Sequence, residues 1–393
     1  MPAPPCKNNR GRTPKDRSLR EHEGSTALRR FKRSGLCLPD ASTNQSWCLL
    51  KIVFLVTSAP GKMCGVADYT SRLAIALGDI GAEVSVELLD YWSLSQIMKI
   101  RRRYRNSPQA IFHLQYPSLN IGNSISPGFL PLLLPNTFVT LHEFRLFHFL
   151  RKMMFFLPSL MSKKIIFSND EERALFRRYF PVSSGRLRVI PIGNNIARTS
   201  QRKQSAETER VVYFGQISHN KGIEFFIETI AQLREKAIPV EVEMIGALVE
   251  SDVEFVDFVK RSADQYKIRL RLNLPPQEVS EALSVATIAL LPFPDGVSNK
   301  RGSALACLDH GVSVLTTHTP LTPEWLSMVT HPVTAPEDAA LLIAKITSGE
   351  APRFKAPDIL TREMHARDWN AIAREHLRLY KEALVGPGSA TAP

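Results

Sequence analysis

Short apolar segments of strand length alternate with segments of helical periodicity along most of this chain, and the alternation starts twice. The first series begins at residue 51 and the second at residue 211, and a polar, aperiodic stretch at 193–209 separates them. Near-continuous apolar strands that alternate with helices predict parallel sheets covered by helices. We therefore expect two doubly wound α/β domains, with the ligand site in a cleft between facing strand ends.

The expected strands of the first series are KIVFLVT (51–57), EVSVELL (83–89), AIFHLQ (110–115), TFVTLH (137–142), KKIIFS (163–168) and LRVIPI (187–192). Those of the second are VVYFG (211–215), VEVEMIG (240–246), IRLRLNL (268–274), ATIALLPF (286–293) and VSVLTT (312–317). The expected domain limits are 49–195 for the first domain, 196–209 for the linker and 210–361 for the second domain. A final helix at about 362–385 carries one apolar stripe and is expected to dock on the body, ahead of a disordered tail at 386–393.

The positive charge of the chain is concentrated at its start. Residues 1–36 hold ten Lys and Arg against three acids, which is +7 of a formal net charge of +12. This stretch has almost no apolar periodicity, so we expect residues 1–48 to form a disordered tail. A nucleic-acid-binding tail is one interpretation of this charge. We favour the other, a nonfunctional extension or an upstream start codon, and regard nucleic acid as an improbable partner.

Five cysteines are too few and too scattered for a disulfide framework, and no CxxC is present. This usage fits the reducing cytosol, so a cytoplasmic protein is expected. The apolar run at 47–56 is far too short to span a bilayer. The segment FRLFHFLRKMMFFLPSLMSKK (144–164) mixes large apolar residues with five cations. It could lie on the inner, anionic face of a membrane as a peripheral contact, or form a core helix with an exposed polar edge.

The stretch PDGVSNKRGSALACLDHG (294–311) has the strongest chemical signal. Two adjacent cations, Lys300 and Arg301, precede a run of small residues that should be helical from about Lys300. The amides of Gly302 and Ser303 would then be unpaired donors in the first turn. Cations at the positive end of a helix dipole are unfavourable unless an anion binds there. The alternative is two solvated cations.

Two other loops follow strands and contain glycine. APGKMCGVADYT (59–70) enters a helix near Ala67, and FGQISHNKG (214–222) places Lys221 before a helix. Such a loop permits backbone approach to a ligand, and the Lys can reach a phosphate. A plain βα turn and a solvated Lys are the respective alternatives. The segment HEFRLFH (142–148) misses the zinc signature H-E-x-x-H and is expected to be an amphipathic helix. We expect no metal and no cofactor.

These segments, in this order, resemble the retaining glycosyltransferases of family 4, which have the GT-B fold. The likeness is carried by CGVADYTSRLAIAL (64–77), VTLHEF (139–144), IIFSNDEERALF (165–176), VIPIGNN (189–195), VVYFGQISHNKGIEFFIETIAQL (211–233), the stretch from ALLPF to LTT (289–317) and the terminal helix (369–380). It covers roughly residues 50–385.

The resemblance implies that the second domain binds a nucleotide-sugar donor and the first a glycan or lipid-linked acceptor. It implies Lys221 on the diphosphate, His142 facing the donor sugar, and Gly246 with Asn273 near the base. We assign Lys221, Arg301 and His142 as catalytic candidates. The donor-binding candidates are Gly215, Gln216, Lys221, Gly246, Asn273, Ser298, Asn299, Lys300, Arg301, Gly302 and Ser303. The acceptor-side candidates are Gly61, Gly65, Asp68 and Tyr69.

The chain departs from that family at two places. Gln216 stands where family members usually have Arg, and we expect Arg301, helped by Lys300, to supply the missing cation. Ser298 and Ala306 stand where a Glu-x7-Glu pair is usual. The expected activity is metal-independent, retaining sugar transfer of the hexosyltransferase type in polysaccharide biosynthesis. The alternative is a GT-B-like protein that binds a nucleotide sugar or glycan without turnover, and a same-fold epimerase is weaker because its acid and His constellation is not evident.

Overall fold

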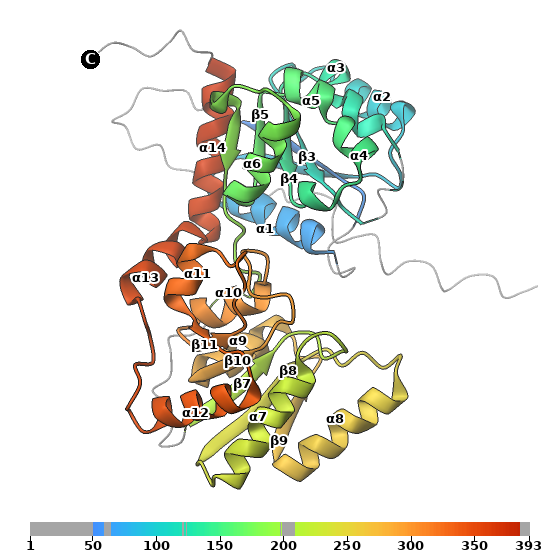
Figure 1. Ribbon diagram of the computed structural model, residues 1–393. Coiled ribbons are helices and arrows are strands. Elements are labelled where there is room, and N and C mark those ends of the chain that lie inside the picture. Colours follow the sequence, from blue (N-terminus) through green and yellow to red (C-terminus); the bar gives the residue numbers. More distant parts are fainter. Residues whose placement is uncertain are drawn as a thin grey trace, which may run out of the picture. The chain divides into compact units, whose positions relative to one another are not determined.

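The computed structural model describes residues 50–58, 64–119, 122, 124–196, 198 and 209–385 (Figure 1). The expected tails at 1–48 and 386–393, most of the expected linker, and Gly61 lie outside the described residues. Both sheets described below belong to one compact unit of the chain.

The first domain contains a six-stranded parallel sheet in the order β2-β1-β3-β4-β5-β6. Its strands are β1 (Lys51–Val56), β2 (Glu83–Leu88), β3 (Ile111–Tyr116), β4 (Thr137–Leu141), β5 (Lys164–Phe167) and β6 (Leu187–Val189). Its helices are α1 (Gly65–Asp79), α2 (Leu94–Arg103), η1 (Ser126–Phe129), α3 (Leu130–Leu133), η2 (Phe144–Leu146), α4 (Phe149–Met153), α5 (Phe156–Met161), α6 (Asp170–Tyr179) and η3 (Ser184–Arg186).

The second domain contains another six-stranded parallel sheet, in the order β12-β11-β10-β7-β8-β9. Its strands are β7 (Glu209–Phe214), β8 (Val240–Gly246), β9 (Ile268–Leu272), β10 (Ile288–Leu291), β11 (Ser313–Thr316) and β12 (His331–Pro332). Its helices are α7 (Ile223–Glu235), α8 (Val253–Tyr266), α9 (Pro276–Val285), α10 (Gly302–Asp309), α11 (Glu324–Val329) and α12 (Pro336–Thr347). The doubly wound prediction is confirmed for both halves.

Every strand except β12 overlaps a segment that the sequence predicted to be a strand. β3 and β4 are buried at every position, as expected for strands covered on both faces. The short strand β12 had no such signal, because it pairs with β11 through only two residues, one of which is a proline. β6 ends at Val189, two residues before Pro191, which cannot donate a ladder hydrogen bond.

Two predicted helices have a different form. The 144–164 segment is not a core helix but three short pieces, η2, α4 and α5, and only Phe144–Leu146 of the expected 142–148 helix is helical. The predicted single C-terminal helix is two helices, α13 (Pro357–Ala366) and α14 (Trp369–Val385). The break falls at Arg367 and Asp368, where the Asp368 carboxylate accepts hydrogen bonds from the Asn370 and Ala371 amides and so begins a new helix.

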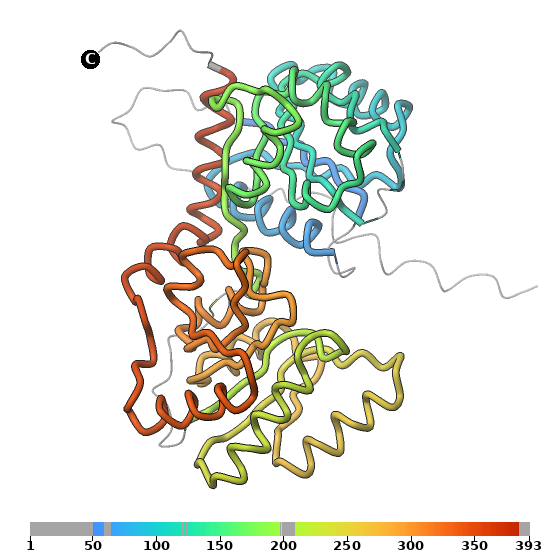
Figure 2. Tube along the Cα trace, viewed as in Figure 1, coloured from blue at the N-terminus to red at the C-terminus, as the bar shows by residue number. Residues whose placement is uncertain are grey.

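The last helix, whose apolar stripe predicted docking on the body, packs on the first domain. α14 packs on α1, and its residues Ile372, Ala373 and Tyr380 share a buried cluster with the strands of the first sheet (Figure 2). The first domain is thus completed by the end of the chain. None of the helices among the described residues is both long enough and apolar enough to cross a membrane.

A buried polar chain joins α14 to this sheet. The Tyr380 hydroxyl lies 2.5 Å from His113 Nδ1 and 3.4 Å from His376 Nδ1, and His113 Nε2 lies 2.7 Å from Thr140 Oγ1. The Tyr69 hydroxyl lies 3.2 Å from His376 Nε2. Because these groups have no access to water, each depends on the next for its hydrogen bond.

We expect Tyr380→Phe to destabilise the protein by about 1–3 kcal/mol, because it leaves His113 without its hydroxyl partner in a dry site. The measurement is the thermal unfolding midpoint of the full chain, which should fall by several degrees. The control is Tyr91→Phe, at a side chain that is 56% exposed, which should not change the midpoint. Equal midpoints for Tyr380→Phe and the unsubstituted protein would contradict this role.

Candidate functional site

The winding of the second sheet changes direction between β7 and β10. From β7 the chain proceeds to β8 on one side, and from β10 it proceeds to β11 on the other. The loops that leave these adjacent strands therefore diverge, which opens a crevice at their carboxyl ends. These loops are residues 215–222 and 292–301, the two stretches in which the sequence placed most of the donor-binding candidates.

Glycines bring the ends of three strands and one helix close together. A Cβ built on Gly246 would lie 1.7 Å from the Gly215 carbonyl oxygen, and Gly246 has a φ of 158°. The Asn273 amide donates to the Gly246 carbonyl over 2.9 Å, so these three candidates lie in sequence along the strand ends. At Gly222, whose φ is 75°, a Cβ would lie 2.1 Å from the Pro292 carbonyl oxygen, which places the start of α7 against the β10 loop.

Helix α10 begins at Gly302, two residues later than predicted, with Arg301 as its N-cap. The Gly302 amide is not an open donor, because it bonds the Lys300 carbonyl over 3.0 Å. The amides of Ser303 and Ala304 remain in the first turn, where a helix offers no backbone acceptor. A Cβ built on Gly215 would lie 3.8 Å from Ser303 Oγ, so this turn adjoins the end of β7.

Arg301 is held in place from two sides. Its guanidinium lies 4.6 Å from the centroid of the Phe293 ring and forms an ion pair with Asp295. Asp295 is exposed, so this pair is open to competition by another anion. Arg301 also lies near Tyr213. Burial raises the pKa of Tyr213, and the positive charge of Arg301 acts against this rise.

Tyr213 organises the loop that follows β7. Its hydroxyl donates to the Gln216 carbonyl over 3.0 Å and lies 3.4 Å from the Lys221 carbonyl. Both ends of the loop are thereby fixed against the buried Tyr213 ring. The structure thus places the Gln216 and Lys221 carbonyls at the Tyr213 hydroxyl, and Gly215 between that hydroxyl and Ser303.

Two of the predicted donor-binding side chains have structural contacts. The Asn299 amide oxygen accepts from Trp325 Nε1 over 2.8 Å and from the Arg367 guanidinium over 3.3 Å, which ties this loop to α11 and the α13–α14 turn. Ser298 Oγ accepts from the Lys300 amide over 3.4 Å. The short polar side chains of this stretch therefore shape the loop.

Lys300 has a carboxylate partner in the first domain. Its Nζ lies 2.8 Å from Glu172 Oε1, on a side chain only 5% exposed at the start of α6. Glu172 Oε2 accepts from the Arg145 amide over 2.9 Å, so both of its oxygens are bonded. The alternative of two solvated cations does not hold, because Lys300 pairs with Glu172 and Arg301 with Asp295.

His142 follows β4 directly and is buried. Its Nε2 lies 2.9 Å from Gln115 Oε1, and its ring meets the Tyr69 ring edge-on with centroids 4.9 Å apart. Burial, with the nearby positive charge of Lys300, lowers the pKa of His142 to about 3. The imidazole is therefore neutral at physiological pH and lies near Lys300.

The acceptor-side candidates divide into different roles. Gly65 is the first residue of α1 and is exposed, and Asp68 lies in the first turn of the same helix. Tyr69 is buried, and its contacts with His376, His142 and Trp369 make it a support for His142. Gly61 lies outside the described residues.

Sequence reasoning missed four residues of this site: Tyr213, Phe293, Asp295 and Glu172. Asp295 stands in the same quoted turn as the cations, six residues before Arg301, and could have been paired with it. In the sequence, Glu172 has the pattern of any acid in the first turn of a helix. No local signal shows that it meets a residue 128 positions away.

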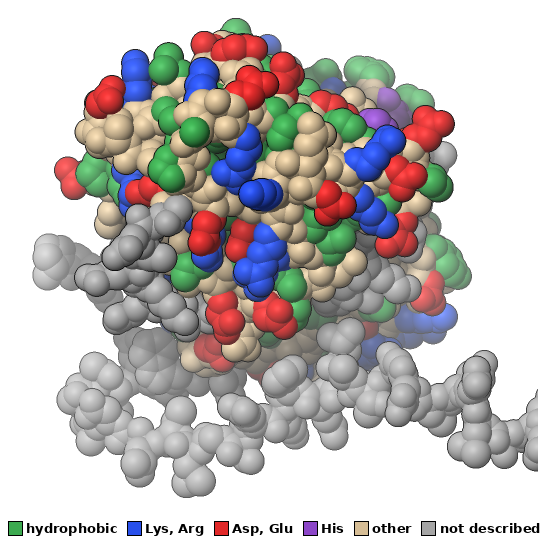
Figure 3. Space-filling view, turned by 90° about the horizontal axis from the view of Figure 1, so that it is seen from below, with side chains coloured by type: hydrophobic (Ala, Val, Ile, Leu, Met, Phe, Trp, Pro, Cys, Tyr) green, Lys and Arg blue, Asp and Glu red, His purple; other side chains and the backbone are tan. Residues whose placement is uncertain are grey.

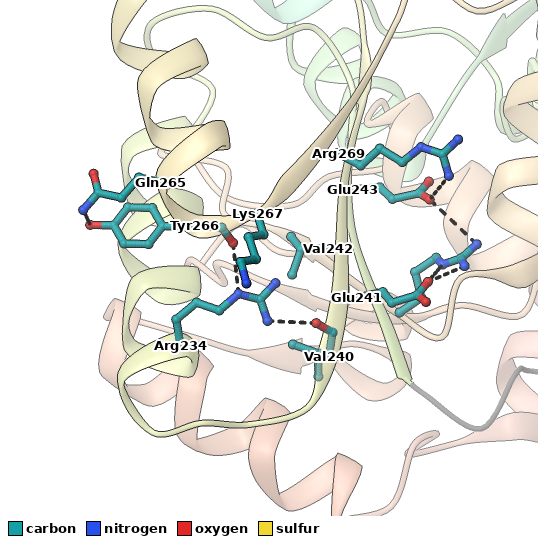
Figure 4. A pocket seen from close by; sticks show the side chains of 10 residues that line it. Arg234, Val240, Glu241, Val242, Glu243, Gln265, Tyr266, Lys267 and Arg269 are labelled. Atoms are coloured by element: carbon teal, nitrogen blue, oxygen red, sulfur yellow. Dashed lines mark hydrogen bonds and ion pairs between the residues drawn. The ribbon is translucent and has the colours of Figure 1, made fainter.

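A separate surface pocket of about 710 Å³ lies at the opposite, amino ends of β7, β8 and β9 (Figure 4). Its charges largely pair with one another. Arg210 pairs with Glu241, and the buried Glu243 lies 3.7 Å from Arg269. Arg234 donates to two backbone carbonyls, those of Tyr266 and Val240. Ligands of open α/β sheets bind at the carboxyl ends, so this pocket is distinct from the candidate site.

Two parallel α/β domains, each wound around its own switch point, form a GT-B fold, in which the C-terminal helix α14 returns to the first domain. Residues 208–348 match the family model described as "Glycosyl transferases group 1", which covers most of the second domain. A search among curated proteins found no match to this sequence.

Solved structures share the fold across most of the chain. A glycosyltransferase from Rickettsia africae has a TM-score of 0.64 at 14% identity, covering 86% of this chain and 99% of its own. HepE from Anabaena, crystallised with UDP and glucose, has a TM-score of 0.58 at 14% identity, covering 85% and 100%. Sucrose-phosphate synthase from Thermosynechococcus elongatus has a TM-score of 0.58 at 15% identity, covering 84% and 98%. The predicted GT-B fold is confirmed.

We expect stability to fall as the pH drops below about 6.5, the ordinary pKa of His. Burial lowers the pKa values of His142 and His376 to about 3 and that of His113 well below its usual value. The unfolded chain therefore binds more protons than the folded chain in this window. The stabilisation is complete above pH 6.5 and is lost as the pH falls toward the folded-state values.

The test is the free energy of unfolding measured between pH 6 and pH 5. Each buried neutral His contributes up to about 1.4 kcal/mol per pH unit to the slope. His142→Asn should therefore give a shallower slope than the unsubstituted protein, whereas His365→Asn, at an exposed position, should not. An unchanged slope for His142→Asn would show that this ring is protonated in the folded state.

Proposed function

We propose that this protein transfers a sugar from a nucleotide-sugar donor to an acceptor, and that the donor diphosphate binds at the amino end of α10. The observation that carries the proposal is that the amino end of α10, with Arg301 and the Ser303 amide, and the loop that contains Lys221 meet at the switch point of the second sheet. Helix amino ends bind phosphate through their free amides and their dipole. The family-model match to the same domain supports a nucleotide sugar as the ligand.

The base and ribose would lie along the strand ends on the β8 side. Gly246 and Asn273 are adjacent there through a backbone hydrogen bond, and neither presents a large apolar side chain to the crevice. Gln216, the exposed residue after Gly215, occupies the place where the related family has Arg. We assign Arg301, at the end of the loop that follows β10, to the diphosphate in place of that Arg.

The chemistry follows from charge. A departing nucleoside diphosphate develops negative charge, and preorganised donors in a fixed geometry stabilise it. Arg301, Lys221 and the α10 amides supply these donors, and the sequence contains no Asp-x-Asp motif to hold a metal ion. We infer that transfer is metal-independent and proceeds with retention, the departing phosphate taking the acceptor proton.

His142 and Glu172 have supporting roles in this account. Because Nε2 donates to Gln115 Oε1, the neutral imidazole keeps Nδ1 as an acceptor for one sugar hydroxyl, and this contact adds no charge. Glu172, which is buried, fixes Lys300 through an ion pair and so anchors the loop that ends in Arg301. The acceptor, a glycan or a lipid-linked sugar, would approach from the side of Gly65 and Asp68.

Arg301→Ala should weaken the binding of UDP, used here as the probe because the Anabaena structure contains it. A lost hydrogen bond to a charged group is worth about 1.5–3 kcal/mol. We therefore expect the Kd measured by calorimetry to rise roughly ten- to hundredfold. The control is Arg261→Ala, an exposed cation on α8, which should leave the Kd unchanged.

Asp295→Asn should act in the opposite direction. Removing this carboxylate releases Arg301 and eliminates a negative charge beside the diphosphate. An exposed ion pair is worth about 0.2–1 kcal/mol, so the Kd should fall by roughly two- to fivefold. Unchanged UDP affinity in both variants would remove Arg301 from the donor site.

The second candidate function is nucleotide-sugar or glycan binding without turnover. Ser298 and Ala306 stand where the related enzymes have two carboxylates, and this difference favours the second candidate. The acids within residues 294–311 do not restore both carboxylates. Donor affinity alone does not separate the two candidates, since each requires a donor site.

The decisive assay incubates the full chain with a panel of UDP-, GDP- and ADP-sugars, with and without EDTA, and follows nucleoside diphosphate release. We expect release from at least one donor, unaffected by EDTA and lost in Lys221→Ala. NMR of the product should show the anomeric configuration of the donor. Donor binding without any release would support the non-catalytic candidate instead.

A further inference from the structure

One segment of the first domain exposes large apolar side chains instead of burying them. No residue of α4 is buried, and the residues at both ends of α5 are exposed. The α4–α5 surface consists of seven residues with their exposed fractions: Leu146 (73%), Phe149 (64%), Leu150 (73%), Met153 (39%), Phe156 (51%), Leu160 (54%) and Met161 (45%). An exposed apolar patch of this kind on a folded domain marks an interaction site.

The exposure does not result from a poorly formed core below. Phe147 and Phe155 are buried under this surface and stack with ring centroids 6.0 Å apart, and Phe155 meets the Tyr116 ring at 5.0 Å. A Cβ built on Gly128 would lie 2.6 Å from the Met154 carbonyl oxygen, so η1 fits closely against the segment. α5 packs beside α3 and η1 (Figure 1). The apolar side chains are therefore presented by a rigid base.

The charges of this segment have one sign. Residues 144–164 contain five cations and no acid, the nearest acids in the chain being Glu143 and Asp170. Arg145 and Lys163 are exposed, and Lys152 lies over the Phe144 and Tyr179 rings. The face seen in Figure 3 differs, because Lys and Arg side chains there lie among Asp and Glu.

We propose that the α4–α5 surface docks on an anionic lipid bilayer. Aromatic and aliphatic side chains that protrude beside cations are the composition of a segment that lies in the interface of a membrane. The apolar residues enter the acyl boundary while the cations meet anionic headgroups. A symmetric contact between two copies is disfavoured, because it would oppose the cations of one copy to those of the other.

The first test is flotation of the full chain with vesicles of phosphatidylcholine alone or mixed with phosphatidylglycerol. We expect binding to the anionic vesicles only, weakened by high salt. The double variant Phe149→Ser with Leu150→Ser should reduce the bound fraction roughly tenfold, because two exposed apolar side chains are lost. The matched control is Val253→Ser with Leu341→Ser, at exposed positions of the second domain, which should bind like the unsubstituted protein.

The basic residues 1–36 could attach the chain to the same vesicles without this surface, so a second readout measures insertion. Phe149→Trp should show stronger fluorescence quenching by brominated lipids than Leu341→Trp. Equal quenching of the two variants, equal flotation of the Ser double variant, or no binding by the unsubstituted protein would each overturn the proposal. So would a dimer in gel filtration that only the Phe149 and Leu150 substitutions dissociate, with no vesicle binding. These measurements need no donor or acceptor, so they do not depend on the proposed function.

Discussion

The crevice of the second domain depends on the close approach of β7 and β8 at their carboxyl ends. A single backbone contact, the Gly215 carbonyl against the α-carbon of Gly246, leaves no room for a side chain and sets the floor of the crevice. Gly222 makes a similar approach to the β10 loop at Pro292. With these distances fixed, the loops after β7 and β10 can only diverge above the floor, and the amino end of α10 faces the space between them.

Side chains of the protein itself hold the cations of this site. Arg301 rests on Phe293 and pairs with an exposed carboxylate, whereas Lys300 pairs with a buried one. These two pairs differ in consequence. A buried ion pair is costly to break, because it leaves an uncompensated charge away from water, whereas an exposed pair is worth little. Lys300 with Glu172 is thus the fixed part of the loop, and Arg301 is the part available to an incoming anion.

Apolar patterns and turn residues in the sequence predicted every strand except β12, the parallel sheets and a last helix that docks on the body, since these depend on patterns a few residues long. The same reasoning proposed Gly215, Lys221 and Arg301 as site residues, and these lie in or beside the loops that follow β7 and β10. It did not predict the partners of the cations, because Glu172 lies 128 residues from Lys300 and reads locally as a helix-start acid. The sequence analysis also assigned Tyr69 to the acceptor side. It did not predict that the Tyr69 hydroxyl is buried against His376, because this contact forms only when α14 packs on the first domain.

The central claim is that the amino end of α10 binds a diphosphate, and a crystal structure of the full chain with UDP tests it most directly. The account predicts the diphosphate within hydrogen-bond distance of the Ser303 and Ala304 amides, with the Arg301 guanidinium turned from Asp295 to a phosphate oxygen and Lys221 beside it. UDP bound at the amino ends of β7–β9, beside Arg210 and Arg269, or bound without contact to Arg301, would contradict it.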